Sequence, residues 1–155
     1  MMSSTVIQRI SQSESIPSDS EIDDWIRKTL TYACHDDREV TLRIVDESEI
    51  EKLNCEYRKV SSPTNVLAFA YHQPPHTELN LLGDVVVCAG VINRQAAELN
   101  APPAVHWARI IAHGVLHLCG YDHLESDEAL QMQCAERWIL KQFGFIHPDL
   151  AETAL

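Results

Sequence analysis

The sequence predicts an α+β fold: a small mixed four-stranded sheet packed with helices, with a central helix that carries candidate metal ligands. Four segments have the apolar and β-branched content of strands, and they alternate along the chain with segments whose apolar residues recur at helical spacing. One helical segment, residues 105–118, is more apolar than the others and is therefore expected at the centre. Strands interleaved with helices favour a mixed sheet with helices packed against it.

The predicted strands are short. Residues 5–10 alternate weakly and residues 39–45 alternate strongly between apolar and polar side chains. Residues 66–71 form a continuous apolar run, which predicts a buried strand. Residues 79–88 are expected to be its hairpin partner or the next strand, with Gly83 as a candidate β-bulge.

Capping signals mark the predicted helices. Ser18 and Glu21 have the spacing of a capping box, which predicts a helix through about residue 34. Gly144 is expected to end the last helix. The remaining helices are expected over residues 48–57, 91–99, 105–118 and 128–143. The side chains expected to face inward are Ile50, Leu53 and Tyr57 in residues 48–57, and Leu130, Cys134, Trp138, Ile139 and Phe143 in the last helix.

Length and composition are those of an ordinary globular protein. The 155 residues predict a single domain, residues 1–155, with 45% hydrophobic and 23% charged residues. No apolar run approaches a membrane span and residues 1–20 lack a signal-peptide core, so a cytoplasmic location is expected. The five scattered cysteines form no C-x-x-C pair, which indicates reduced thiols. A net charge of −11 disfavours broad electrostatic binding to nucleic acid.

The most informative stretch runs from His113 to His123 and reads HGVLHLCGYDH. His113 and His117 are four residues apart, so both imidazoles lie on one face of a helix. Gly120 can adopt the left-handed conformation that ends a helix, and the returning chain would bring His123 towards the same point. Three neutral imidazoles with room for a water molecule are typical of a catalytic zinc site. The stretch therefore predicts one Zn²⁺ per chain, bound by these three histidines.

The spacing also matches the H-E-x-x-H-x-x-G-x-x-H pattern of one class of zinc proteases, except at its second position. Gly114 stands where those proteases have the glutamate that acts as general base. The motif keeps the three candidate metal ligands. It lacks the base of a peptidase, because glycine cannot accept a proton. The pattern indicates hydrolytic chemistry without the usual protease mechanism.

Other candidate residues each have an ordinary structural alternative. Arg58 precedes a Pro-Thr-Asn turn and could hold a phosphate, although its position alone favours a solvated charge at a helix end. Asp84 and Asp122 are candidates for a carboxylate that accepts a hydrogen bond from a ligand histidine. Cys119 is expected to pack in the core, because it points to another helix face than His117. The remaining histidines are not expected to be ligands: His35, His72, His76 and His147 because they should be solvated, and His106 because it lies two helical turns before the motif.

Three blocks of the sequence resemble the YbeY family of bacterial metal-dependent endoribonucleases. The first is the histidine motif, residues 113–123. The second, NCEYRKVSSPTNVLAF in residues 54–69, is similar to the family's Asn-x-x-Tyr-Arg followed by Pro-Thr-Asp-Val-Leu-Ser-Phe. The third, LGDVVVC in residues 82–88, is similar to Leu-Gly-Asp-Ile-Val-Ile-Cys. Asn65 and Ala68 depart from the family pattern, which has Asp and Ser at these positions.

This resemblance implies a function as well as a fold. It implies zinc bound by His113, His117 and His123, with His113 and Arg58 as catalytic residues and Arg58 at the scissile phosphate. The implied substrate is single-stranded RNA, with a role at the 3′ end of the small-subunit ribosomal RNA and in ribosome quality control. The implied partners are the small ribosomal subunit and associated factors such as the GTPase Era, with no membrane; the oligomeric state stays open.

Two other functions remain open at this point. A metallohydrolase that acts on a peptide or small ester would need a base outside the motif, and Glu125 is the candidate that follows it. A non-enzymatic, metal-stabilised ribosome assembly factor would use zinc structurally. Its metal would need a fourth protein ligand, for which Cys119 and Asp122 are nearest.

Overall fold

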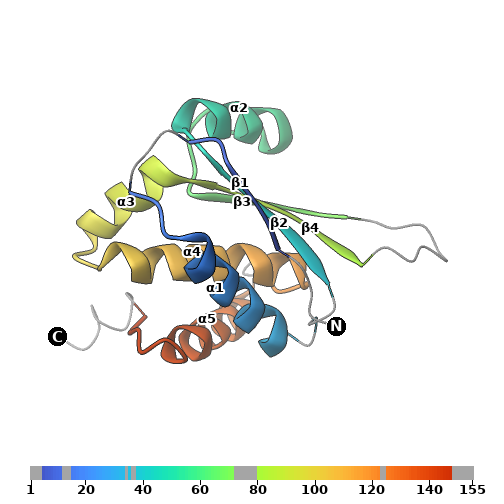
Figure 1. The fold of residues 1–155 in the computed structure, drawn as a ribbon. Helices are drawn as coiled ribbons and strands as arrows, with labels where there is room; N and C mark the ends of the chain where they lie inside the picture. The colour runs from blue at the N-terminus through green and yellow to red at the C-terminus, as the bar shows by residue number, and fades with distance from the viewer. Residues whose placement is uncertain are drawn as a thin grey trace.

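The computed structural model describes residues 5–11, 15–33, 35, 38–71, 80–122 and 125–147. These ranges contain the predicted α+β fold, with a mixed sheet and helices on both of its faces (Figure 1). The elements in chain order are β1 (Thr5–Arg9), α1 (Asp19–Tyr32), β2 (Glu39–Val45), α2 (Glu47–Arg58), β3 (Val66–Ala70), β4 (Leu81–Cys88), α3 (Ala89–Glu98), α4 (Pro103–Leu118) and α5 (Ser126–Lys141).

The sheet has the strand order β1-β2-β4-β3. The first three strands in this order are parallel, and β3 is the antiparallel hairpin partner of β4 at one edge. The prediction that β3 is buried is wrong: Leu67 is buried, but the other residues of β3 are partly or fully exposed, because an edge strand has a neighbour on one side only. The pairing of β2 with β4 shifts by one residue: Glu39 pairs with Leu81 and Val40 pairs with Gly83. Leu82 is left out of the pairing, so this irregularity lies next to Gly83, the candidate bulge residue.

Helices cover the two faces of the sheet unequally. α1 and α4 pack against one face, α5 packs on both of these helices, and α2 lies over the opposite face (Figure 1). α4 also contacts α3 and the strands β3 and β4, and most of its residues are buried. Although α4 is strongly apolar, neither it nor another helix in the described ranges is long and apolar enough to cross a membrane.

α4 ends in a Schellman motif at the glycine that the sequence predicts. Gly120 has φ +100°, and its N–H donates to the carbonyl of His117 at 3.1 Å. The N–H of Tyr121 donates to the carbonyl of Leu116 at 3.0 Å. The ring of Tyr121 then packs against Tyr32 of α1, with 6.4 Å between the ring centroids. The chain is therefore reversed directly after the second histidine of the motif, in a turn held by α1.

The inward faces predicted for α2 and α5 are partly wrong. Tyr57, in the last turn of α2, is 60% exposed and packs edge-on against Phe69 of the edge strand β3. In α5, Leu130, Cys134 and Trp138 are exposed. The buried residues of α5 are Met132, Ala135, Glu136, Ile139 and Leu140. Apolar residues lie on both stripes of α5, and the true inward stripe contains a glutamate, so apolar spacing alone does not distinguish the two stripes.

Gly83 is a position where the packing of β3 and α4 onto β4 excludes a side chain. A Cβ added there would lie 2.4 Å from the carbonyl oxygen of Phe69 and 2.7 Å from Cδ2 of Leu118. We expect Gly83→Ala to lower the free energy of unfolding by about 1–3 kcal/mol, because the backbone oxygen cannot move without disturbing the strand pair. Urea denaturation followed by circular dichroism measures this change.

The matched control for this prediction is Gly90→Ala in α3. A Cβ at Gly90 would meet the carboxylate end of Glu47 at 3.2 Å, and that flexible side chain can move. Since alanine also favours a helix over glycine by about 1 kcal/mol, Gly90→Ala should leave stability unchanged or raise it. Equal denaturation midpoints for Gly83→Ala and Gly90→Ala would contradict the close approach at Gly83.

Candidate metal centre and active site

His113 and His117 lie one turn apart on the same side of α4, as their spacing predicts. Their rings are edge-on to each other, with 4.8 Å between centroids and 76° between planes. Both side chains are half-buried. Gly114 follows His113 in the sequence, and its face of α4 packs directly on β4 and β3. A Cβ at Gly114 would lie 2.7 Å from Val85 and 3.0 Å from Val66. The histidine pair is therefore held beside the edge strand of the sheet.

His113 is hydrogen-bonded to a buried carboxylate that the sequence analysis did not identify. Its Nδ1 lies 2.8 Å from Oε2 of Glu136, which comes from α5. The other oxygen of Glu136, Oε1, lies 2.9 Å from Nε2 of His147 and 3.4 Å from Nε of Arg109. Glu136 is 3% exposed, so this carboxylate is almost completely enclosed. One buried acid thus joins α4, α5 and the segment after α5.

The surroundings of Glu136 keep it ionised. Burial alone would raise the pKa of this carboxyl group, but hydrogen bonds from His113 and His147 and the positive charge of Arg109 together lower its pKa to about 2. An ionised carboxylate can only accept hydrogen bonds. Both histidines must therefore present N–H groups to Glu136, which places a proton on Nδ1 of His113.

The prediction that His147 is solvated is wrong, because His147 is 2% exposed. The chain turns back after α5 at Gly144, which has φ +74°, and the N–H of Phe145 donates to the carbonyl of Leu140 at 3.0 Å. This left-handed turn brings His147 back onto Glu136. A histidine near the end of a chain carries no local signal for such a contact, since it depends on the packing of α5 against α4.

A pocket of about 380 Å³ opens beside His113 along α4. It is lined by Asn65, Gln95, Glu98, Leu99, His106, Arg109, Ile110 and His113. Oε1 of Gln95 accepts from Nδ2 of Asn65 at 3.1 Å and lies 3.0 Å from Nε2 of His106. Asn65 departs from the family pattern, and its side chain here contacts α3. The pocket therefore combines a candidate metal ligand with both amide and charged side chains.

Arg58 lies at the last position of α2 and is exposed. Its side chain makes no hydrogen bond or ion pair with any residue in the described ranges. After Lys59, which has φ 59°, the chain runs to Val66 beside Gly114 of α4. The Arg58 segment is thus connected to the wall of the histidine site by one loop, while the placement of its guanidinium at a substrate stays a prediction.

The other candidate residues near the motif are Cys119, Asp122 and His123. Cys119 packs against the main core, and burial raises the pKa of its thiol to about 12, in agreement with a packing role. Asp122 is half-buried beside the turn after α4. His123 lies outside the described residues. Within the described ranges, no three His, Cys, Asp or Glu side chains form a ligand cluster, so the three-histidine site stays a prediction.

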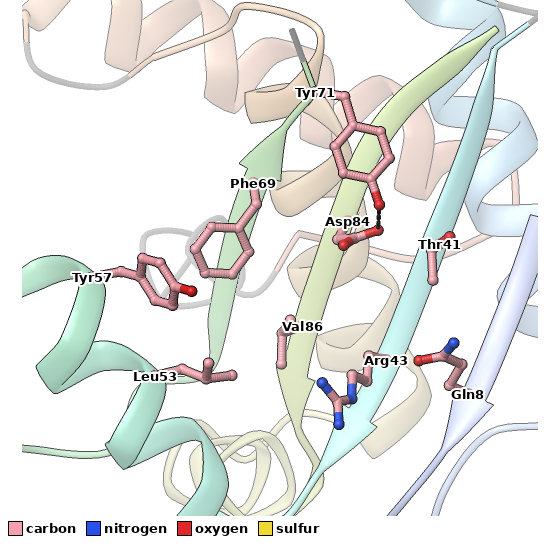
Figure 2. Close-up of a pocket in the computed structure, with 9 residues that line it drawn as sticks. All are labelled: Gln8, Thr41, Arg43, Leu53, Tyr57, Phe69, Tyr71, Asp84 and Val86. Carbon is pink, nitrogen blue, oxygen red and sulfur yellow. Dashed lines mark hydrogen bonds between the residues drawn. The ribbon is translucent and has the colours of Figure 1, made fainter. Parts of the chain in front are cut away.

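Asp84 does not contact the histidine pair. It lies on the opposite face of the sheet, where the hydroxyl of Tyr71 donates to Oδ1 of Asp84 at 2.6 Å (Figure 2). This hydrogen bond is the main reason that the pKa of Tyr71 is raised to about 12. The two residues help to line a second pocket of about 460 Å³ between the sheet and α2. The candidate role of Asp84 as the partner of a ligand histidine is therefore taken by Glu136.

One sequence signal could have identified Glu136. Glu136 lies at helical spacing among buried apolar residues of α5, Met132, Ala135, Ile139 and Leu140. A charged residue inside an apolar stripe indicates a buried polar contact. The signal is visible only when this stripe is recognised as the inward one.

Comparison with known proteins identifies relatives of this chain. The family model described as Endoribonuclease YbeY matches residues 7–144. An Endoribonuclease YbeY from Alteromonas mediterranea is 47% identical over 133 residues, which cover 86% of this chain and 84% of the relative. The solution structure of TM1509 from Thermotoga maritima is similar with a TM-score of 0.57 and 21% identity, over 89% of this chain and 91% of that one, and supports the fold. With a family match over most of its length and a curated relative at this level of identity, the chain belongs to the YbeY endoribonuclease family.

Proposed function

We propose that this protein is a zinc-dependent endoribonuclease specific for single-stranded RNA, which acts in the maturation of the 3′ end of small-subunit ribosomal RNA and in ribosome quality control. The observation that carries the proposal is the pair His113 and His117, fixed on one face of α4 beside a polar pocket, in a chain of this family. The small ribosomal subunit and associated factors such as the GTPase Era are the proposed partners, in the cytoplasm.

The side chains present fit a zinc ion. Neutral imidazoles are common zinc ligands, and the hydrogen bond from Nδ1 of His113 to Glu136 is the partner arrangement that ligand histidines usually have. His113, His117 and His123 would hold the ion. When bound, zinc supplies Lewis acidity at a phosphate and makes a water molecule more acidic.

The protein's own groups would bind and orient the RNA. The pocket beside His113 is within the size range of ligand sites, and its amide groups can hydrogen-bond a ribose or a base edge. Arg58 is suited to hold the non-bridging oxygens of the scissile phosphate and to stabilise the negative charge that develops there. Because Gly114 cannot act as the base of a peptidase, the site favours a phosphodiester over a peptide substrate.

We expect Arg58→Glu to lower kcat/KM for cleavage of a single-stranded RNA by about 10²–10³-fold while zinc content stays the same. The reason is that a charge which stabilises the transition state is replaced by one that repels the phosphate. The measurement combines gel-based cleavage of a labelled RNA with metal analysis of the purified variant.

The matched control is Arg94→Glu. Arg94 is an exposed arginine of α3 that pairs with Glu47, so its replacement changes the net charge of the protein by the same amount. Wild-type cleavage by Arg58→Glu would remove Arg58 from the reaction. A wild-type protein that binds zinc but cuts no single-stranded RNA would favour a metal-stabilised assembly factor instead.

A further inference from the structure

Glu136 is a charged residue where packing alone would favour an apolar one. Its neighbours on the inward face of α5 are Met132, Ala135, Ile139 and Leu140. Taking a carboxylate out of water costs several kcal/mol, and the contacts with His113, His147 and Arg109 are needed to offset this cost. An aliphatic side chain would need none of these partners, so packing alone does not explain the carboxylate.

The two oxygens of Glu136 have different partners. Oε2 faces Nδ1 of His113 at 2.8 Å, which is the shortest contact of the group. Oε1 faces the partly exposed Arg109 and the buried His147. The partners of Oε1 hold the second oxygen of the carboxylate, so they restrict its rotation and keep Oε2 directed at the imidazole.

We propose that Glu136 is a positioning residue for the metal centre: it fixes His113 in the tautomer with the proton on Nδ1 and the lone pair on Nε2, and His147 holds Glu136 in place. The inference rests on the proposed function in one respect, since it takes His113 as a metal ligand. In an isolated neutral histidine either nitrogen can carry the proton, and only an unprotonated nitrogen can bind a metal. The carboxylate oxygen that lies 2.8 Å from Nδ1 favours a proton on that nitrogen, so the lone pair for the metal lies on Nε2.

The proposal makes the segment after α5 part of the support of the metal centre. The turn at Gly144 returns the chain so that His147 lies on the carboxylate eleven residues before it. His147 does not need to touch metal or RNA for this role. Its effect passes through Glu136 to the ring of His113.

The test compares Glu136→Gln with Glu98→Gln in the full chain. Glu98 is an exposed carboxylate on the rim of the pocket beside His113, so its replacement removes the same charge near the site without removing a hydrogen bond to the ligand. Zinc affinity is measured by competition with a chromophoric chelator. We expect Glu136→Gln to weaken zinc binding by about 10–100-fold, the usual effect of losing the partner of a ligand histidine, and Glu98→Gln to leave it unchanged.

A glutamine at position 136 would offer both a carbonyl oxygen and an N–H₂ group, so it no longer dictates the tautomer of His113. The second measurement therefore reads the tautomer directly, from ¹⁵N NMR of the histidine rings in the wild-type protein before and after zinc is added. We expect Nδ1 of His113 to carry the proton in both states. This readout uses the wild-type protein alone and does not depend on a variant being folded.

His147→Leu tests whether the contact of His147 with Glu136 contributes to zinc binding. It removes one of the two donors to Oε1 and puts an apolar side chain of similar size in its place, and we expect zinc binding to weaken less than in Glu136→Gln. Equal zinc affinity of wild type, Glu136→Gln and His147→Leu in folded protein would overturn the proposal. So would a proton on Nε2 of His113 in the wild type.

Failure of this inference and failure of the proposed function give different results. If zinc binding weakens in Glu136→Gln but the wild type cuts no RNA, the positioning role stands and the nuclease function falls. If wild type and Glu136→Gln bind zinc equally and the wild type cuts RNA, the function stands and the positioning role falls.

Discussion

Replacing His117 with alanine is expected to abolish zinc binding and to lower kcat/KM for RNA cleavage by more than about hundredfold. His117 and His113 face each other across one turn of α4, with 4.8 Å between ring centroids, so loss of one ring removes one of the three proposed ligands. Loss of a partner of a metal ligand commonly costs 10–100-fold, and loss of the ligand itself should cost more. The fold should persist, because His117 is only half-buried, whereas its apolar neighbours Val115, Leu116 and Leu118 are buried.

The measurement combines metal analysis, RNA cleavage and a thermal unfolding curve for each protein. Arg58→Glu is the informative companion, because it should lose cleavage while keeping zinc. If His117→Ala retains a full equivalent of zinc, the metal is bound elsewhere and the three-histidine site is wrong. If His117→Ala loses zinc but cuts RNA as the wild type does, the metal is structural and cleavage depends on other groups.

The histidine pair and the turn after it could be predicted from the sequence because both follow from local geometry. Residues four apart share a helix face whatever the helix packs against, and Gly120 supplies the left-handed conformation that the Schellman motif requires. The capping box at Ser18 and Glu21 formed as predicted for the same reason: all its hydrogen bonds are between near neighbours in sequence.

Glu136 and His147 could not be predicted in this way, since their roles depend on how α5 rotates against α4. Apolar residues occur on two stripes of α5, and the stripe with Leu130, Cys134 and Trp138 is as apolar as the true inward stripe. Tertiary packing placed a charged residue inside, and hydrogen bonds to His113, His147 and Arg109 compensate its burial. The general rule that charged side chains stay outside therefore fails at a residue that contacts one of the proposed metal ligands.

Arg58 is a residue whose proposed role the structure of the protein alone does not reveal. Its spacing alone favours a solvated charge at a helix end, and its exposure agrees with that description. The resemblance of residues 54–69 to the family assigns it to catalysis, and family membership is now shown over residues 7–144. A role that exists only when substrate is bound leaves no hydrogen bond in the protein alone, so Arg58 has to be tested by cleavage.

Gly114→Glu is expected to destabilise the protein by about 3 kcal/mol or more and to create no peptidase. The substitution restores the glutamate of the zinc-protease pattern, but the face of α4 at Gly114 is closed. A Cβ there would lie 2.7 Å from Cγ1 of Val85 and 3.0 Å from Cγ2 of Val66. Overpacking of this kind costs about 1–3 kcal/mol, and a carboxylate forced among valine side chains adds a desolvation penalty.

Urea denaturation of Gly114→Glu, Gly114→Ala and Ala97→Glu separates these contributions. Gly114→Ala should show the overpacking alone, and Ala97→Glu, on an exposed position of α3, should show that a new glutamate on a helix surface is tolerated. A wild-type denaturation midpoint for Gly114→Glu would mean that the glutamate finds space towards the histidines, and the protease mechanism would then be open again. The expected loss of stability would instead show that the contact of α4 with β3 and β4 requires a glycine inside the histidine motif. The same packing that places His113 and His117 would then exclude the base of a peptidase.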